Sequence, residues 1–333
     1  MFKKKKVCVI FGGMSTEHEV SIVSAKNVIK NIDELKYDVY SIKIDKNGNW
    51  LNSENEQIKN LVDYLQSMDV VFPVLHGKYG EDGTIQGLLD LAKVPYVGCG
   101  VLASSICMDK VYAKIVFEKA KIPQADYIYL KNENIYVDEN MDEIELNNNE
   151  IVELVSKKLG FPVFVKPSNS GSSVGISKAI DDESLIRAIE EAAMYDNKIL
   201  IEKGINGKEV ECAVLGNDKI EASTVGQIFS AEDFYSYDAK YNNSESKTKI
   251  PADIDEDKIN EIRRLAIKAF KAVDGKGLAR VDFFVEDETN KVIINEINTM
   301  PGFTEISMYP KLWNSVGLNY SDLLTKLIEL SLK

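Results

Sequence analysis

Polar residues at alternate positions in two apolar segments near the C-terminal end constrain the fold more than any other feature. Arg280 and Asp282 lie two residues apart in the first segment, and Glu296 and Asn298 lie two residues apart in the second. Side chains two apart on a strand share a face, and the intervening residues are mostly Val, Ile and Phe. The pattern predicts two neighbouring strands with one core-facing side and one side that presents four polar groups.

The same pattern predicts the register of an antiparallel hairpin. Both polar pairs face one side only if the loop holds an odd number of residues, and pairing Asp287 with Lys291 leaves three. This register sets Asp282 opposite Glu296 and the arginine opposite the asparagine. We therefore expect the four side chains to converge.

Asp282, Glu296 and Asn298 offer hard oxygen donors, which suit Mg²⁺ that keeps some waters and shares its shell with nucleotide phosphates. An ordinary hairpin with solvated carboxylates is the alternative. The apolar neighbours favour the metal site, because unpaired charge next to a buried face is costly. Arg280 would neutralise a developing oxyanion.

Composition excludes several classes of function. The 333 residues include 53 acidic and 40 basic side chains, and the net charge of -13 repels nucleic acid and anionic membranes. The apolar run at 7–11 is too short for a signal peptide, and no stretch approaches the roughly 20 apolar residues of a membrane span. The 4 cysteines show no zinc-binding spacing. We expect a cytoplasmic protein that binds neither nucleic acid nor membrane.

Strand and helix patterns predict an α/β domain followed by two α+β domains. Alternating strands and helices indicate a parallel sheet in an N-terminal domain at 1–105. A central domain follows at 106–206, and a C-terminal domain at 207–333 contains the metal site and a polar loop at 229–249, whose length indicates function. Individual expectations include a capping box at Thr16 and Glu19, a strand at 94–98 and a helix at 108–119.

A serine- and glycine-rich segment at 168–175 follows Lys166 and Pro167. Its small residues let backbone amides approach a phosphate, although the order is not that of a P-loop. A plain loop is the alternative, and the neighbouring Lys166 favours the phosphate-binding interpretation. The backbone of the strand at 198–203 could bind adenine through hydrogen bonds, with Glu209 near the ribose. The alternative is an ordinary strand.

Motifs along nearly the whole chain resemble the D-alanine–D-alanine ligase family. They are Gly12-Gly13 with Glu17-His18-Glu19-Val20-Ser21, His76-Gly77 with Gly80-Glu81-Asp82-Gly83, Met108-Asp109-Lys110, Lys166-Pro167 with Gly171-Ser172-Ser173-Val174-Gly175, Tyr237-Asp238-Ala239-Lys240-Tyr241, Arg280-Val281-Asp282, and Asn295-Glu296-Ile297-Asn298-Thr299 with Pro301-Gly302.

The resemblance implies a three-domain ATP-grasp fold, two D-alanine molecules and ATP as substrates, two Mg²⁺ or Mn²⁺ ions, a D-alanyl phosphate intermediate and a homodimer that serves peptidoglycan precursor synthesis. It also implies residue roles. The ATP-binding residues would be Lys110, Lys166, Ser172, Ser173, Glu202, Lys203, Ile205, Glu209 and Lys240. The substrate and catalytic residues would be Glu17, His76, Ser172, Tyr241, Arg280, Gly302, Ser307 and Met308. The metal ligands would be Asp282, Glu296 and Asn298.

Features of the sequence distinguish D-alanine–D-alanine ligation from four alternative functions. Relatives that make D-alanyl-D-serine or D-alanyl-D-lactate depart from the Tyr-x-Ala-Lys-Tyr pattern, whereas this chain keeps Tyr241. Another ATP-grasp ligase would lack Glu17, Ser172 and Tyr241 together. A dinucleotide-dependent dehydrogenase would need the third glycine of GxGxxG, which is absent. A catalytically inactive binding module is disfavoured because every metal and phosphate candidate is present.

Overall fold

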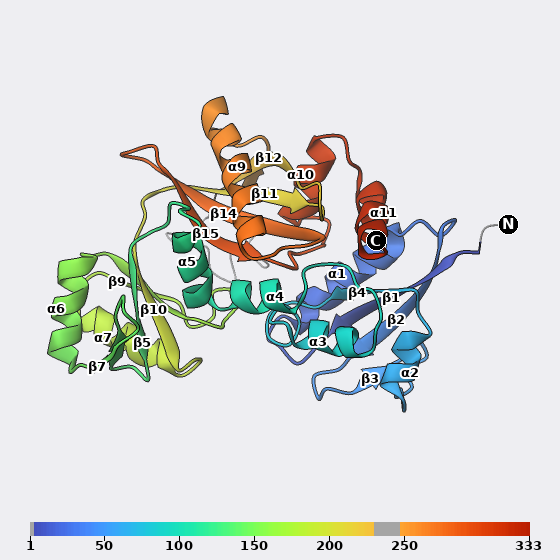
Figure 1. Ribbon diagram of the computed structural model, residues 1–333, viewed down its shortest axis with the longest axis horizontal. Coiled ribbons are helices and arrows are strands. Elements are labelled where there is room, and N and C mark those ends of the chain that lie inside the picture. The colour runs from blue at the N-terminus through green and yellow to red at the C-terminus, as the bar shows by residue number, and fades with distance from the viewer. Residues whose placement is uncertain (1–2, 230–246) are drawn as a thin grey trace.

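The computed structural model describes residues 3–229 and 247–333, which form three β-sheets with helices packed on them (Figure 1). In the first sheet the strand order is β3-β2-β1-β4, and β1 pairs in parallel with β2 and β4. The buried apolar run of β1 fits a central parallel strand, which is covered on both faces. The elements here are β1 Lys5–Gly12, α1 His18–Asn31, β2 Tyr37–Ile44, β3 Trp50–Leu51, α2 Leu61–Gln66, β4 Val70–Val74, α3 Thr84–Leu91 and α4 Val101–Met108.

The second sheet has six strands in the order β7-β6-β5-β10-β8-β9, and its central strand β10 pairs antiparallel with β5 and β8. The helices α6 and α7 share a hydrophobic cluster with the sheet, and both begin with capping boxes. The elements are α5 Lys110–Lys119, β5 Tyr127–Lys131, β6 Ile135–Val137, β7 Glu143–Glu145, α6 Asn148–Lys158, β8 Val163–Pro167, β9 Ser177–Ala179, α7 Asp182–Ala193 and β10 Lys198–Lys203.

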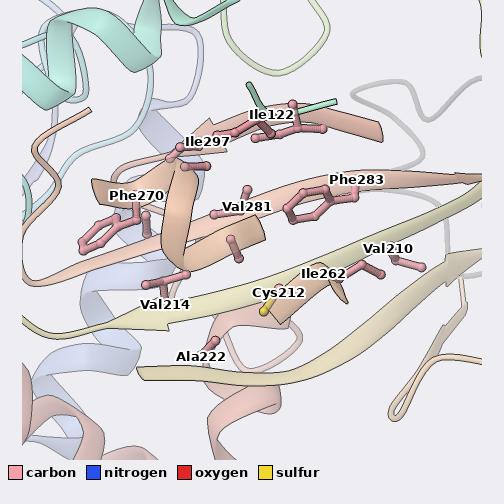
Figure 2. Close-up of a cluster of buried hydrophobic side chains, with 14 of the residues drawn as sticks. Ile122, Val210, Cys212, Val214, Ala222, Ile262, Phe270, Val281, Phe283 and Ile297 are labelled. Atoms are coloured by element: carbon pink, nitrogen blue, oxygen red, sulfur yellow. The ribbon is translucent and has the colours of Figure 1, made fainter. Parts of the chain in front are cut away.

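The third sheet has the order β13-β12-β11-β14-β15. Figure 2 shows Val281 and Phe283 of β14 in one buried cluster with Ile262 and Phe270 of α9. Because strand side chains alternate, the residues between them face away from this helix. The elements are β11 Gly207–Leu215, β12 Glu221–Phe229, β13 Lys247–Lys249, α9 Glu256–Ala272, β14 Leu278–Glu286, β15 Val292–Asn298, α10 Met308–Ser315 and α11 Tyr320–Ser331.

The C-terminal helices connect the third sheet to the first, and α11 lies beside α1 (Figure 1). Phe303 is fully buried where they meet. Its ring centroid is 5.6 Å from that of Phe72 on β4, 5.7 Å from Tyr309 on α10 and 6.4 Å from Tyr320 on α11. The segment between β15 and α10 is therefore anchored to both sheets.

The predicted fold class is confirmed: an N-terminal α/β unit precedes two α+β units. Strands β2 at 37–44 and β14 at 278–286 have the bounds that their apolar runs in the sequence predict. The domain boundaries at 105 and 206 stay predictions. Within the described ranges, no helix is long and apolar enough to cross a membrane.

Three local expectations were wrong. The segment 94–98 forms only one bridge, between Val71 and Tyr96, because Pro95 has no N–H for a ladder. The helix expected at 108–119 is broken at Asp109, which is extended and caps the second piece through the N–H of Tyr112.

The capping box at the start of α1 does not form. Glu17 is the N-cap and makes no side-chain capping hydrogen bond, because its carboxylate contacts the Ser172 hydroxyl instead. Glu19 pairs with Lys46. A contact with a residue far along the chain thus replaces a local one.

Replacing Phe303 by alanine should lower the free energy of unfolding by about 3–5 kcal/mol, because a fully buried aromatic ring is lost at the contact between two sheets. Urea denaturation measures this change. Leu35→Ala is the control, since Leu35 is 87% exposed and should shift stability by no more than about 0.5 kcal/mol. Equal effects of the two substitutions would contradict this packing.

Candidate active site

One cleft of about 820 Å³ is lined by strands of the second and third sheets, by residues that follow β1 and β4 of the first sheet, and by part of the 168–175 segment. Asp282 does not line it, because Asp282 is buried beneath Arg280. Lys240, Tyr241 and most of the loop at 229–249 lie outside the described residues. The sequence-predicted residues that line the cleft are Glu17, His76, Lys110, Lys166, Ser172, Ser173, Glu202, Lys203, Ile205, Glu209, Arg280, Glu296, Asn298, Gly302, Ser307 and Met308.

The polar face of the β14–β15 hairpin is built as predicted. Asp282 pairs with Glu296, and Arg280 pairs with Asn298. The predicted loop register was wrong, however. A bulge at Asn295 shifts the pairing, so that Val285 lies opposite Val292 and the loop has four residues, with Glu286 N–H donating to the Lys291 carbonyl at 2.9 Å.

The bulge places hydrophobic and polar residues of β15 on opposite faces. Val292 and Ile294 lie in the core cluster, and unbroken alternation would send Glu296 to that same face. One extra residue at position 295 reverses the alternation. Glu296 and Asn298 therefore face the cleft.

Arg280 lies on this polar face and is held there by the carboxylates of Asp282 and Glu211. Its Nε and Nη2 donate to the two Asp282 oxygens at 2.7 and 2.6 Å, and Nε lies 3.2 Å from Glu211 Oε2. Burial disfavours the charge of Arg280, but Asp282 and Glu211 outweigh burial and raise its pKa. The guanidinium is therefore a fixed positive charge.

The donor set fits a hard divalent cation. Asp282 Oδ2 also accepts from Asn298 Nδ2 at 3.0 Å, and each carboxylate oxygen keeps further acceptor capacity. Glu296 and the Asn298 side chain add oxygen donors at the surface of the cleft. Among residues 3–229 and 247–333 no three His, Cys, Asp or Glu side chains cluster as a metal site.

Two lysines hold Glu202 on the opposite wall. Lys166 Nζ donates to Glu202 Oε2 at 2.6 Å, and Lys114 of α5 forms an ion pair with Oε1. Burial would raise the pKa of Glu202, but the two ammonium groups outweigh it and lower this pKa to about 2. Glu202 also raises the pKa of Lys166 against the effect of burial. Both groups remain charged.

The 168–175 segment forms a turn tied to the start of α5. Ser172 and Ser173 adopt left-handed conformations with φ of 48° and 59°, which non-glycine residues rarely take. Lys110 Nζ donates to the Ser170 carbonyl at 2.6 Å, and its own N–H donates to the Ser168 carbonyl at 3.0 Å. One ammonium and a turn of small residues thus face the cleft together.

The remaining predicted residues lie where the first sheet meets the segment after β15. His76 Nδ1 donates to the Met300 carbonyl at 3.1 Å, and Nε2 lies 3.1 Å from Ser24 Oγ. Burial lowers the pKa of His76, although Glu17 opposes this. A Cβ on Gly302 would lie 2.7 Å from Ser307 Oγ, so a larger residue there would require that hydroxyl to move.

Three charged residues of the site were missed by the sequence analysis: Glu81, Lys114 and Glu211. Glu211 lies two residues after Glu209 on a strand, a signal that could have found it. Glu81 accepts from the Gly77 N–H at 2.6 Å. Burial, together with the charge of Glu17, raises the pKa of Glu81 to about 8.

Comparison with known proteins agrees with this geometry. The family model described as "D-ala D-ala ligase C-terminus" matches residues 116–329, and the model of the N-terminus matches 6–64 and 52–99. The D-alanine–D-alanine ligase of Acetivibrio thermocellus is 52% identical and covers 100% of this chain and 97% of its own. That of Clostridium novyi is 48% identical, with 99% and 98% covered.

Solved structures agree as well. The D-alanine-D-alanine ligase from Coxiella burnetii has a TM-score of 0.83 at 35% identity, covering 99% of this chain and 94% of its own. The VanG D-Ala:D-Ser ligase from Enterococcus faecalis has a TM-score of 0.86 at 37% identity, covering 99% and 100%. Fold and cleft thus define an ATP-dependent carboxylate–amine ligase of the ATP-grasp class. Within that class, the chain belongs to the D-alanine–D-alanine ligase family.

Replacing Glu81 by glutamine should stabilise the protein increasingly as pH rises from about 4.5 to about 8. A carboxyl whose folded pKa lies above its usual 4.5 binds its proton more tightly in the folded state, so folding loses stability through this window as the proton is removed. The amide removes that loss. Thermal unfolding of variant and wild type across pH measures the difference.

The exposed Glu34→Gln substitution is the matched control and should follow the wild type at every pH. A stability difference between Glu81→Gln and wild type that stays constant over this range would show that burial does not perturb Glu81.

Proposed function

We propose that this chain joins two D-alanine molecules into D-alanyl-D-alanine at the expense of ATP, through a D-alanyl phosphate, for peptidoglycan precursor synthesis. The supporting observation is the cleft itself. It brings Lys166 of the second sheet and the Ser172 turn together with Arg280 and Glu296 of the third sheet, and with Glu17 at the start of α1. These are groups for a nucleotide, for developing charge and for a substrate ammonium.

Nucleotide binding is assigned to one wall of the cleft. Lys110, Lys166 and the turn at Ser172 and Ser173 would hold phosphates, because ammonium groups and closely approaching amides favour anions. The adenosine would lie against Glu202, Lys203, Ile205 and Glu209, and Lys240 would approach the transferred phosphate.

Substrate binding is assigned to the other end of the cleft. Glu17 would bind the ammonium of the first D-alanine, and the Ser172 hydroxyl and Tyr241 would hold the loop over it. His76, Ser307 and Met308 would line the two substrate positions. His76 is held by contacts with the Met300 carbonyl and the Ser24 hydroxyl.

The reaction proceeds in two transfers. A carboxylate oxygen of the first D-alanine attacks the γ-phosphorus of ATP, ADP leaves, and an acyl phosphate forms. The amine nitrogen of the second D-alanine then attacks the carbonyl carbon, loses a proton, and expels inorganic phosphate. Arg280 and the Gly302 N–H would stabilise the tetrahedral oxyanion, which is where preformed donors lower the barrier most.

Asp282, Glu296 and Asn298 would hold Mg²⁺ or Mn²⁺, with two ions expected. The ions supply positive charge for the transferring phosphoryl group. The chain contributes the ligands and keeps Arg280 charged beside them. A homodimer and a cytoplasmic location complete the proposal.

D-alanyl-D-serine synthesis is the second candidate, since the ligase from Enterococcus faecalis described above is named for D-serine. The Tyr-x-Ala-Lys-Tyr pattern with Tyr241 supports D-alanine as second substrate. Use of D-lactate, or of the substrates of other carboxylate–amine ligases, would also be detected by measuring phosphate release.

Phosphate release with ATP, Mg²⁺ and D-alanine tests the proposed reaction. We expect rapid release with D-alanine alone, and little additional release when D-serine or D-lactate is added at limiting D-alanine. Product analysis identifies the dipeptide. No phosphate release with D-alanine would refute the proposed substrate, and preferential formation of D-alanyl-D-serine would favour the second candidate.

Replacing Glu296 by alanine should lower kcat at least about 10²-fold, which corresponds to roughly 3 kcal/mol of transition-state stabilisation. The variant should fold, because Glu296 lies on the cleft face and outside the hydrophobic core. Glu288→Ala in the exposed hairpin loop is the control and should keep wild-type turnover. Near-normal kcat in Glu296→Ala would contradict the metal assignment.

A further inference from the structure

Lys114 is a buried cation to which the proposed mechanism gives no role. It lies on α5 one turn after Lys110, and its side chain is 3% exposed. A buried ammonium is costly unless it is paired, and burial does lower the pKa of Lys114. Its partner is Glu202 of β10, in the expected adenosine pocket. The aromatic ring of Tyr127 on β5 lies 5.2 Å from the Lys114 nitrogen.

The two oxygens of Glu202 differ in their surroundings. Lys166 holds Oε2 at 2.6 Å and lines the cleft, so a nucleotide can take over that contact. Lys114 holds Oε1 and does not line the cleft. When Lys166 binds a phosphate instead of Glu202, Lys114 still pairs with Glu202. Lys114 is then the cation that keeps this buried carboxylate ionised.

Few other charges act on this pair. Glu202 is approached by Lys114 from α5 and by Lys166 from β8. Asp126, which precedes β5, acts on Lys114, while Glu209 and Glu296 act on Lys166. The ammonium behind Glu202 is therefore the group that fixes its charge independently of the cleft.

An ionised carboxylate can only accept hydrogen bonds, whereas a protonated one can also donate. We propose that Lys114 is a specificity-determining positioning residue. It holds Glu202 as an ionised acceptor, so the base site takes a purine with a 6-amino donor and rejects a 6-oxo purine. The inference rests on the proposed function, because it needs the base to lie against Glu202.

The discrimination has a clear physical origin. A 6-oxo group facing an ionised carboxylate places two acceptors together, and no hydrogen bond can form between them in a buried site. Without Lys114, burial favours the protonated acid, which can donate to the 6-oxo group. Loss of the lysine should therefore weaken the preference for adenine over hypoxanthine, even though Lys114 does not touch the base.

Binding of ADP and IDP, measured by titration calorimetry, tests the inference without any need for turnover. We expect wild type to favour ADP, and Lys114→Met to reduce the ratio of the two Kd values at least about 10-fold, which corresponds to 1.4 kcal/mol. Lys114→Arg should restore the ratio, because it keeps the charge. Lys119→Met, which removes an exposed lysine from the same helix, should match the wild type.

Glu202→Gln keeps the test decisive even if Lys114→Met does not fold. The amide can donate, so this variant should lose the discrimination by itself, and adding Lys114→Met should change the ratio less than about two-fold, since the two residues act as one unit. Unchanged ratios in Lys114→Met or Glu202→Gln would overturn the inference. Wild-type protein that binds neither nucleotide would instead overturn the proposed function.

Discussion

The ion pair between Arg280 and Asp282 is the interaction on which the site depends. Both side chains lie on the face of β14 that turns away from α9, and removing either would leave a buried charge without its partner. Glu211 on the adjacent strand and Asn298 on the other neighbour complete the set. The sheet must therefore keep β11, β14 and β15 in one register, which in turn fixes the floor of the cleft.

The rest of the cleft is assembled around that floor from separate parts of the chain. Phe303 fastens the segment after β15 to the first sheet, which brings Gly302 and His76 to the same end of the site. The break in the helix at Asp109 lets its side chain accept from Ser168 Oγ at 2.6 Å, which ties the start of α5 to the serine turn. The charged groups of the cleft therefore come from separate parts of the chain rather than from one domain.

The sequence predicted the parts of this structure that follow from periodicity. Alternation along two apolar strands identified both polar pairs and their alignment at Asp282 and Glu296. The bulge at Asn295 was not predictable, because the apolar run from Val292 to Ile294 fits strands with or without an extra residue. The burial of Lys114 was also not predictable from the sequence, because a lysine one turn after another lysine indicates a solvated helix face. Only the structure shows its partner, Glu202 on β10. The placement of individual metal ligands, by contrast, stays a prediction.

Binding of Mn²⁺ in the presence of ADP, followed by electron paramagnetic resonance, tests most directly whether the polar face of this hairpin is a metal site. The wild-type protein should bind Mn²⁺ tightly under these conditions. The isosteric Asp282→Asn substitution, which removes one ligand charge, should weaken that binding at least about 10-fold, as expected for loss of an oxygen ligand to a hard cation. Superimposable Mn²⁺ titrations of the wild type and Asp282→Asn would contradict the account.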